Sequence, residues 1–207
     1  MQRKPVRRSR QNTRARLVEA AVDVFAERPF GRVTVDHLVA AAGFTRGAFY
    51  PNFSSIEELF HEVYTHQADL MIREVNFVLD GVDQGEFRLE AFRDVFEALH
   101  PYGRSWFPLH QEYTLLAVRD PEAREQFVSN VHQFQERMEE LVQRMLSLLG
   151  RAPSLPLGQI RDMLLALYLH ALGTEQLGTG GLGTEELMAD VVPQLLLSLS
   201  RPTGERE

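Results

Sequence analysis

The sequence predicts an all-α protein of about nine helices, in which a small helical head precedes a larger helical bundle. Apolar residues recur every three or four positions along most of the 207 residues, as the buried face of a helix requires. No stretch alternates apolar and polar residues as a half-buried strand would. Capping residues, glycines and prolines separate the periodic stretches, so they give the boundaries of the expected helices.

A basic arm and one helix are expected at the start of the head. Residues 1–9 are mostly basic and polar, so we expect a disordered arm. A helix then covers about 11–28 and ends before Pro29, because a proline disfavours helical geometry in the residue that precedes it. The head, residues 10–54, has a core in which we expect Phe25, Leu38, Phe49 and Phe53.

Two short helices joined by a tight turn at Gly43 are expected next. Apolar residues at i, i+3, i+4 and i+7 from Val35 form one stripe of the first helix, and Thr34 stands where its N-cap is needed. Thr45 can cap the second helix, which runs to about Tyr50. This arrangement indicates a helix-turn-helix, whose second helix enters the DNA major groove.

The rest of the chain, residues 55–207, is expected to form the larger helical bundle. Its helices are predicted at 55–79, 86–99, 105–118, 120–148, 157–177 and 184–200. Pro101 and Gly103 should break the chain between two of these helices, and residues 150–156 should form a loop. Pro193 should kink the last helix, because it lacks a backbone donor.

The turn and its flanking residues carry a resemblance to a known family. The DNA-binding domain of TetR family transcriptional regulators is similar to this chain over about residues 14–63, in the pattern Ala42-Gly43-Phe44-Thr45-Arg46-Gly47-Ala48-Phe49-Tyr50-x-x-Phe53, followed by Ser55-x-Glu57-x-Leu59. A looser resemblance to one subgroup covers Glu112 to Arg124. The resemblance implies a sequence-specific DNA-binding regulator, most simply a repressor that an effector releases from a palindromic operator. An activator is the alternative.

Arg46 is the expected reader of base sequence. It is the only long basic side chain on the second short helix, so it can pair with guanine; contact with phosphate alone is the alternative. Gly47 and Ala48 are small enough to let the helix approach base edges. Phe49 can touch a thymine methyl group or fill the core.

Further DNA contacts are expected from hydroxyl, amide and basic groups. The resemblance implies phosphate contacts at Thr34, Thr45, Tyr50 and Asn52. Basic residues at the start of the chain, Arg7, Arg8 and Arg10, are expected to contact phosphate or the minor groove. This chain departs from the family pattern at Val39, Pro51, Asn52 (usually His) and Ile56 (usually Lys or Arg), so the resemblance does not give the operator sequence.

The resemblance also implies a homodimer and an effector pocket. The last two helices offer candidate interface residues, which could instead be monomer core: Ile160, Met163, Leu164, Leu167, Ala171, Leu187, Val191, Leu195 and Leu199. Aromatic and polar residues of the central helices are the pocket candidates, again with core packing as the alternative: Trp106, Phe107, His110, Tyr113, Phe127, Phe134, Tyr168 and His170. Such a pocket favours a small, mainly apolar or aromatic effector.

The charge distribution supports the same division into a DNA-binding head and a separate body. Residues 1–53 hold ten Lys/Arg and four acidic residues, a net charge of +6, which leaves −13 on the other 154 residues. A basic head on an acidic body suits a chain of which only one end binds phosphate. No cysteine is present, and neither a signal peptide nor a bilayer-length apolar run is visible, so we expect a cytoplasmic protein.

We expect no enzyme activity, metal site or cofactor. Residues 178–183 fit G-x-G-x-x-G literally but follow a helix rather than a strand, so they are better interpreted as a loop. His61 and His66 are one residue too far apart for a zinc-binding H-E-x-x-H helix, and they face different sides. An all-helical interaction protein without preference for a DNA sequence is the alternative class.

Overall fold

The computed structural model describes residues 10–82, 91–181 and 183–203. Its α-helices are α1 (Arg10–Glu27), α2 (Val35–Ala41), α3 (Ile56–Asp80), α4 (Ala91–Arg119), α5 (Pro121–Leu148), α6 (Leu157–Leu177), α7 (Thr184–Glu186) and α8 (Val192–Ser198). Two 3-10 turns, η1 (Phe30–Arg32) and η2 (Arg46–Ala48), and a π-helical segment, η3 (Leu187–Val191), complete the helical structure. The all-α prediction is confirmed, although the helices divide differently from the prediction.

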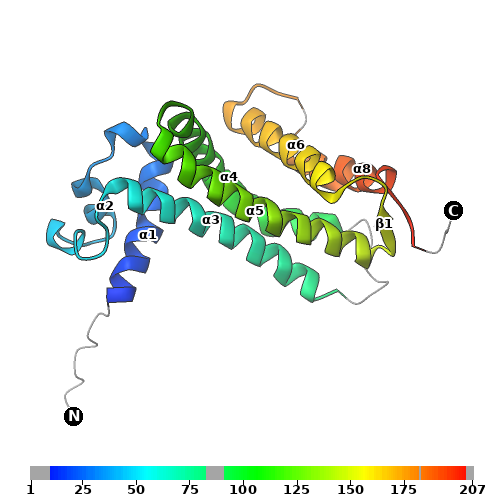
Figure 1. Cartoon of the computed structure of the whole chain (residues 1–207), viewed down its shortest axis with the longest axis horizontal. Helices are drawn as coiled ribbons and strands as arrows, with labels where there is room; N and C mark the ends of the chain where they lie inside the picture. Colours follow the sequence, from blue (N-terminus) through cyan, green and yellow to red (C-terminus); the bar gives the residue numbers. More distant parts are fainter. Residues whose placement is uncertain (1–9, 83–90, 182, 204–207) are drawn as a thin grey trace, which may run out of the picture.

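The head lies at one end of an elongated molecule, where α2 packs against α1 and α1 packs against α3 (Figure 1). Its expected core is confirmed: Leu38 and Phe49 are 0% exposed, and Phe25 and Phe53 are also buried. The Phe25 ring meets the ring of Phe60 on α3 edge to face, with 5.0 Å between centroids. Burial of these aromatic groups fixes the head on the long helix.

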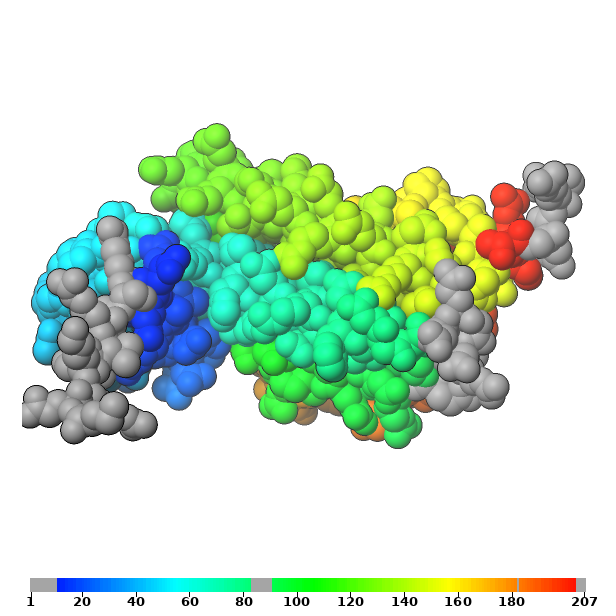
Figure 2. All heavy atoms as spheres, turned by 90° about the horizontal axis from the view of Figure 1, so that it is seen from below, coloured from blue at the N-terminus to red at the C-terminus, as the bar shows by residue number. Residues whose placement is uncertain are grey.

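Helix α3 joins the head to the body. Ser55 caps it by accepting a hydrogen bond from the Glu58 backbone N–H at 3.2 Å. Buried residues follow from Leu59 to Leu79, and the helix extends from the head along one face of the molecule (Figure 2). The position of the boundary at residue 54 stays a prediction.

The predicted break at Pro101 and Gly103 is wrong, because both residues lie inside the continuous helix α4. Pro108 also lies within α4, and the Arg104 carbonyl one turn before it accepts a hydrogen bond from Gln176 Nε2 at 2.8 Å. Because Pro108 has no N–H to donate to this carbonyl, a side chain of α6 makes the hydrogen bond instead. The long apolar face of α4 offsets the cost of the prolines by burial, which single-residue signals do not report. The predicted start of this helix, residues 86–90, lies outside the described residues.

Two short strands, β1 (Arg151–Pro153) and β2 (Ser200–Pro202), form an antiparallel pair in which Ala152 lies opposite Arg201. The prediction of a plain loop at 150–156 missed β1, because three residues are too short to show alternation. Near Pro193 the prediction of one kinked helix is corrected: α7, the π-helical segment η3 and α8 follow one another. Within the described residues, no helix is long and apolar enough to cross a membrane.

Candidate nucleic-acid interface and effector region

The turn at Gly43 is confirmed, but the second short helix is only the 3-10 turn η2. Gly43 has φ 69°, and the following Phe44 N–H donates to the Val39 carbonyl at 2.7 Å, which closes the turn. The Thr45 side chain makes no capping hydrogen bond in the described structure, contrary to the prediction. Pro51 helps to end the segment, because it disfavours a helical conformation in the residue before it.

Arg46 and Tyr50 project from this segment into solvent. The Arg46 side chain is 62% exposed and Tyr50 is 56% exposed. Arg46 Nη1 lies 3.2 Å from Asp36 Oδ2 on α2. The hydrogen bond to Tyr50, and then the charge of Asp36, raise the pKa of Arg46, so its guanidinium stays charged. Gly47 is exposed as well, and a Cβ added there would meet no atom within 4 Å.

Two predicted DNA contacts are corrected, because their side chains are buried. Phe49 is 0% exposed and packs on Phe53 with 5.9 Å between ring centroids, so it fills the core and does not touch a base. Asn52 is 7% exposed, and its Nδ2 donates to the Ala48 carbonyl at 2.8 Å rather than pointing outward. Ala48 itself is half-buried. Helical spacing alone did not show which face of so short a segment is inside.

Thr34 and His37 form a reciprocal cap at the start of α2. Thr34 Oγ1 accepts from the His37 N–H, and His37 Nδ1 accepts from the Thr34 N–H, each at 3.3 Å. Thr34 is exposed, as Thr45 is. The sequence analysis identified Thr34 as the cap but missed His37, because Glu or Gln usually holds the third position of a capping box. Arg7 and Arg8 lie outside the described residues, as does the side chain of Arg10.

Two arginines of α1, which the sequence analysis counted only as charge, hold the head together. The Arg14 guanidinium lies 4.1 Å from the centroid of the Phe53 ring. It also bonds the Asn52 carbonyl and pairs with two carboxylates of α3, on Glu58 and Glu62. Arg14 therefore ties α1 to α3 and to the end of the exposed segment.

Arg16 supports the turn itself. Its guanidinium lies 4.5 Å from the centroid of the Phe44 ring, and its Nη2 donates to the Ala42 carbonyl at 2.9 Å. Arg14 and Arg16 both lie within the basic head, but their contacts are internal. Charge counting could not separate these structural arginines from those available to DNA.

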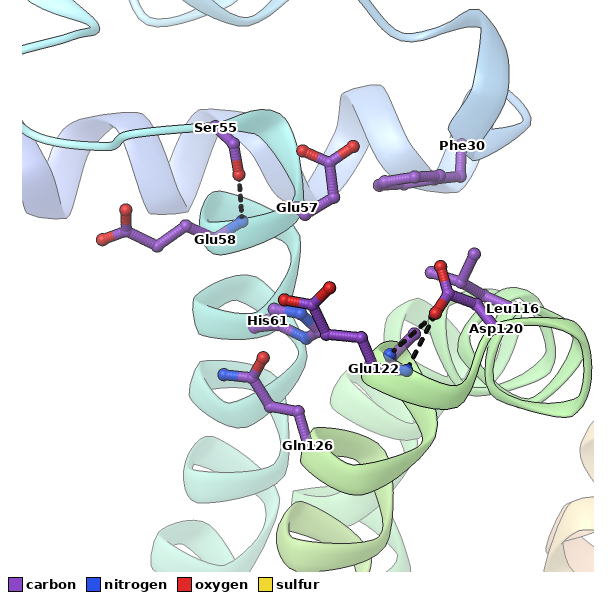
Figure 3. Close-up of a pocket in the computed structure, with 10 residues that line it drawn as sticks. Phe30, Ser55, Glu57, Glu58, His61, Leu116, Asp120, Glu122 and Gln126 are labelled. Carbon is purple, nitrogen blue, oxygen red and sulfur yellow. Dashed lines mark hydrogen bonds between the residues drawn. The ribbon is translucent and has the colours of Figure 1, made fainter.

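An acidic cleft of about 440 Å³ separates the head from the corner between α4 and α5 (Figure 3). Glu57, Glu122 and His61 line it, together with Asp120, whose carboxylate accepts from the backbone N–H groups of Glu122 and Ala123. Burial lowers the pKa of His61. A cleft with this charge repels phosphate, so DNA is not expected to enter it.

Most of the predicted effector residues are packed against one another. Trp106 and His110 stack with 4.5 Å between ring centroids, and Tyr113 meets Phe127 at 4.7 Å. The hydroxyl of Tyr64 on α3, a residue that the sequence analysis missed, lies 3.0 Å from His110 Nδ1. Burial lowers the pKa of His110 to about 4, so the ring is neutral at pH 7.

The remaining effector candidates occupy three different environments. Phe134 is buried against Trp106, and Tyr168 is buried against Gly103. Phe107 is half-buried beside Gly173, whereas His170 is on the exposed side of α6.

The apolar cavity lies elsewhere, toward the end of the body that is farther from the head. It has a volume of about 60 Å³ and is lined by Met71, Ile72, Val75, Phe92, Val95, Leu99, Met138, Leu141, Val142, Met145, Leu164, Met188 and Val192. None of the eight predicted effector residues lines this cavity, and their part in effector binding stays a prediction. The prediction selected mainly aromatic residues, whereas the cavity is lined mainly by methionine and aliphatic side chains.

The predicted dimer residues divide into two sets. Ile160, Leu164, Ala171 and Leu187 are buried within their own chain, so monomer core is the correct interpretation for them. Met163, Leu167, Val191, Leu195 and Leu199 are half-buried, on α6 and on the segment from η3 to the end of α8. Figure 1 shows these elements together along one side of the body, away from α3.

The fold and the exposed turn define a helix-turn-helix DNA-binding protein with a helical body. Comparison with known proteins identifies the family of the helix-turn-helix. The sequence pattern described as "Bacterial regulatory proteins, tetR family" matches residues 17–63. Residues 17–63 therefore form a DNA-binding domain of the TetR family of bacterial regulatory proteins.

Two relatives match different shares of the chain. An uncharacterised HTH-type transcriptional regulator from Bacillus subtilis, YfiR, is 26% identical over 165 residues, or 80% of each chain. The probable acrEF/envCD operon repressor of Escherichia coli K12 is 36% identical over 58 residues, 28% of this chain and 26% of the repressor. The higher identity is therefore confined to a short region.

Solved structures share the fold over nearly the whole chain. A TetR-family regulator from Mesorhizobium loti has a TM-score of 0.67 at 15% identity and covers 95% of this chain and 99% of its own. FadR from Bacillus subtilis, solved with stearoyl-CoA, has a TM-score of 0.65 at 17% identity, with coverage of 89% and 97%.

Proposed function

We propose that this regulator is a repressor that binds a palindromic operator as a homodimer and leaves it when an effector occupies the body. The observation that carries the DNA-binding surface is the exposure of Arg46 and Tyr50 beside two buried aromatic residues, Phe49 and Phe53. The buried pair anchors η2, so the exposed pair is presented on a rigid base. Thr34 and Thr45 flank this surface with exposed hydroxyl groups that can bond phosphate.

Arg46 has a specific role in this proposal. In the free protein it is paired with Asp36, and that exposed pair is weak enough for a guanine or a phosphate to replace it. Bidentate contact to guanine gives discrimination of about 1–3 kcal/mol per base pair. Loss of Arg46 should therefore reduce affinity for one sequence more than for DNA in general.

The proposed dimer uses the five half-buried residues of α6, η3 and α8 defined above. A single turn such as η2 contacts too few bases for high specificity, whereas two copies read two half-sites. Twofold symmetry then implies an operator with an inverted repeat. Sedimentation should give twice the 23.7 kDa chain mass.

An effector acts by binding one arrangement of the body more tightly than another. The apolar lining of the 60 Å³ cavity supports an apolar effector, and Met71, Ile72 and Val75 of this lining belong to α3. Because α3 also carries the head, a change in this lining can alter the spacing of two heads. FadR from Bacillus subtilis, which shares this fold, was solved in complex with stearoyl-CoA, a ligand with a long apolar chain, and this supports the proposal.

Footprinting on the DNA that flanks the protein's own gene tests the proposal. The wild type should protect an inverted repeat, and Arg46→Ala should lose about 1–3 kcal/mol on that site with a smaller loss on random DNA. Arg73→Ala is the matched control, because Arg73 is an exposed arginine of α3 that forms an ion pair with its neighbour Glu74. Equal losses on both DNAs would refute base reading, and protection without any sequence preference would favour a nonspecific helical binding protein.

A further inference from the structure

Four buried side-chain polar atoms in the described part of the chain have no hydrogen-bond partner, and three of them lie where α4 meets its neighbours. They are Trp106 Nε1, Tyr168 Oη and His100 Nδ1. Trp106 is 1% exposed and Tyr168 is 8% exposed, so solvent does not satisfy them. A buried polar group without a partner costs about 1–3 kcal/mol, which a bound ligand or an ordered water would recover.

These atoms belong to one region of the interior. Tyr168 of α6 lies directly on Gly103 of α4, where an added Cβ would be 2.9 Å from the Tyr168 ring carbon Cζ. His100 and Trp106 are three residues before and after Gly103, so both are one helical turn from it. The His100 Nε2 pairs with Glu175 of α6 at 3.3 Å.

The apolar cavity begins one turn away on each of three helices. On α4, Leu99 lines the cavity four residues before Gly103; on α6, Leu164 lines it four residues before Tyr168. On α5, Met138 lines it four residues after Phe134, whose ring lies 5.2 Å from that of Trp106. His100, Trp106 and Tyr168 are not part of the cavity lining, but they belong to the turns of α4 and α6 that follow its lining residues Leu99 and Leu164.

We propose that this region binds an amphiphile, with an aliphatic chain in the methionine-lined cavity and an oxygen acceptor bonded by Tyr168 Oη and Trp106 Nε1. The proposal rests on the proposed function, because it names the class of the effector. An indole N–H only donates, and a phenol that stays neutral also donates, so the pair selects a carboxylate or an acyl carbonyl. Burial and the charge of Glu175 raise the pKa of Tyr168, which keeps its hydroxyl protonated.

The size of the cavity requires that its lining moves. Four of the six methionines of the chain, Met71, Met138, Met145 and Met188, line it. Methionine side chains are flexible and rearrange around apolar ligands at low cost. The 60 Å³ space is thus the start of a larger site that the chain of the ligand opens.

Intrinsic fluorescence tests the proposal directly, because Trp106 is the only tryptophan in the chain. Decanoate and methyl decanoate, below their aggregation concentrations, should change its emission saturably; decylammonium, whose head group only donates, should bind at least tenfold more weakly. Tyr168→Phe should lower the affinity for decanoate and methyl decanoate, the two probes with an acceptor head group, by about three- to tenfold, as expected for the loss of one hydrogen bond. Tyr102→Phe is the matched control, a half-buried tyrosine of α4 outside the set.

A second variant tests the position of the chain. Val142→Phe places a ring against the cavity and should abolish binding of both acceptor-headed probes, with circular dichroism confirming that the helices persist. If Tyr168→Phe binds these probes like the wild type, if decylammonium binds as well, or if no saturable change occurs with chains of eight to fourteen carbons, the proposal is overturned. Ordered water then satisfies the polar atoms.

Release of DNA separates this inference from the proposed function. Tyr168-dependent binding that leaves the footprint unchanged would support the ligand site and refute its role as an effector site. Release of the operator by another compound, with no effect of Tyr168→Phe, would support the repressor and overturn the amphiphile.

Discussion

Replacement of Arg14 by alanine should destabilise the head, and its contacts allow the magnitude to be worked out. The guanidinium makes three kinds of contact: with the Phe53 ring, with the Asn52 carbonyl and with the carboxylates of Glu58 and Glu62. Its side chain is 34% exposed, so the ion pairs are partly screened.

The cation–π contact contributes about 0.5–1 kcal/mol at such a site. The charged hydrogen bond to a carbonyl contributes about 1.5–3 kcal/mol, and each exposed pair adds only about 0.2–1 kcal/mol. These contributions share one side chain and are not additive, so we expect a loss of about 2–3 kcal/mol in the free energy of unfolding.

Urea unfolding followed by circular dichroism measures this loss. Arg14→Lys should show an intermediate value, because an ammonium keeps the charge but cannot make the same set of planar contacts. Arg73→Ala should change stability by less than about 0.5 kcal/mol, as expected of an exposed arginine paired only weakly. If Arg14→Ala and Arg73→Ala were equally stable, the assignment of Arg14 as the tie between α1 and α3 would be refuted.

Three further predictions follow from individual contacts. Gly103→Ala should cost about 1–3 kcal/mol in urea unfolding, because its Cβ would overlap the Tyr168 hydroxyl; stability equal to the wild type would show that α6 moves freely. Burial lowers the pKa of His110 to about 4, below its value in the unfolded chain. The stability that neutral His110 contributes to the folded state is therefore fully present above about pH 6.5 and is lost as pH falls toward 4. Unfolding at pH 7 and pH 5 should therefore show a decrease of about 2 kcal/mol that His110→Asn reduces; an identical pH dependence in the variant would assign the decrease to other groups. Asp36→Asn should strengthen DNA binding at low salt, because it removes a negative charge and frees Arg46, and unchanged filter-binding affinity would contradict this.

The errors in the sequence analysis have identifiable physical causes. Phe49 and Asn52 belong to a segment too short for periodicity to fix its buried face, and both proved to be inside. Pro101 is a reliable local breaker in isolation, yet packing along α4 overrides it. The effector candidates do not line the apolar cavity, whose lining is mainly methionine and aliphatic, and their part in effector binding stays a prediction.

Local sequence patterns were enough to predict the helical class, the helix-turn-helix and the basic character of one end. Those features depend on periodicity, caps and charge within a few neighbouring residues, so linear order is enough to read them. The folded chain was needed to see that Arg14 is structural, that Arg46 is exposed and that three buried polar atoms lack a partner near α4. These features depend on contacts between residues far apart in sequence, such as the Arg14–Glu62 ion pair and the packing of Tyr168 on Gly103. Patterns among neighbouring residues do not predict such contacts.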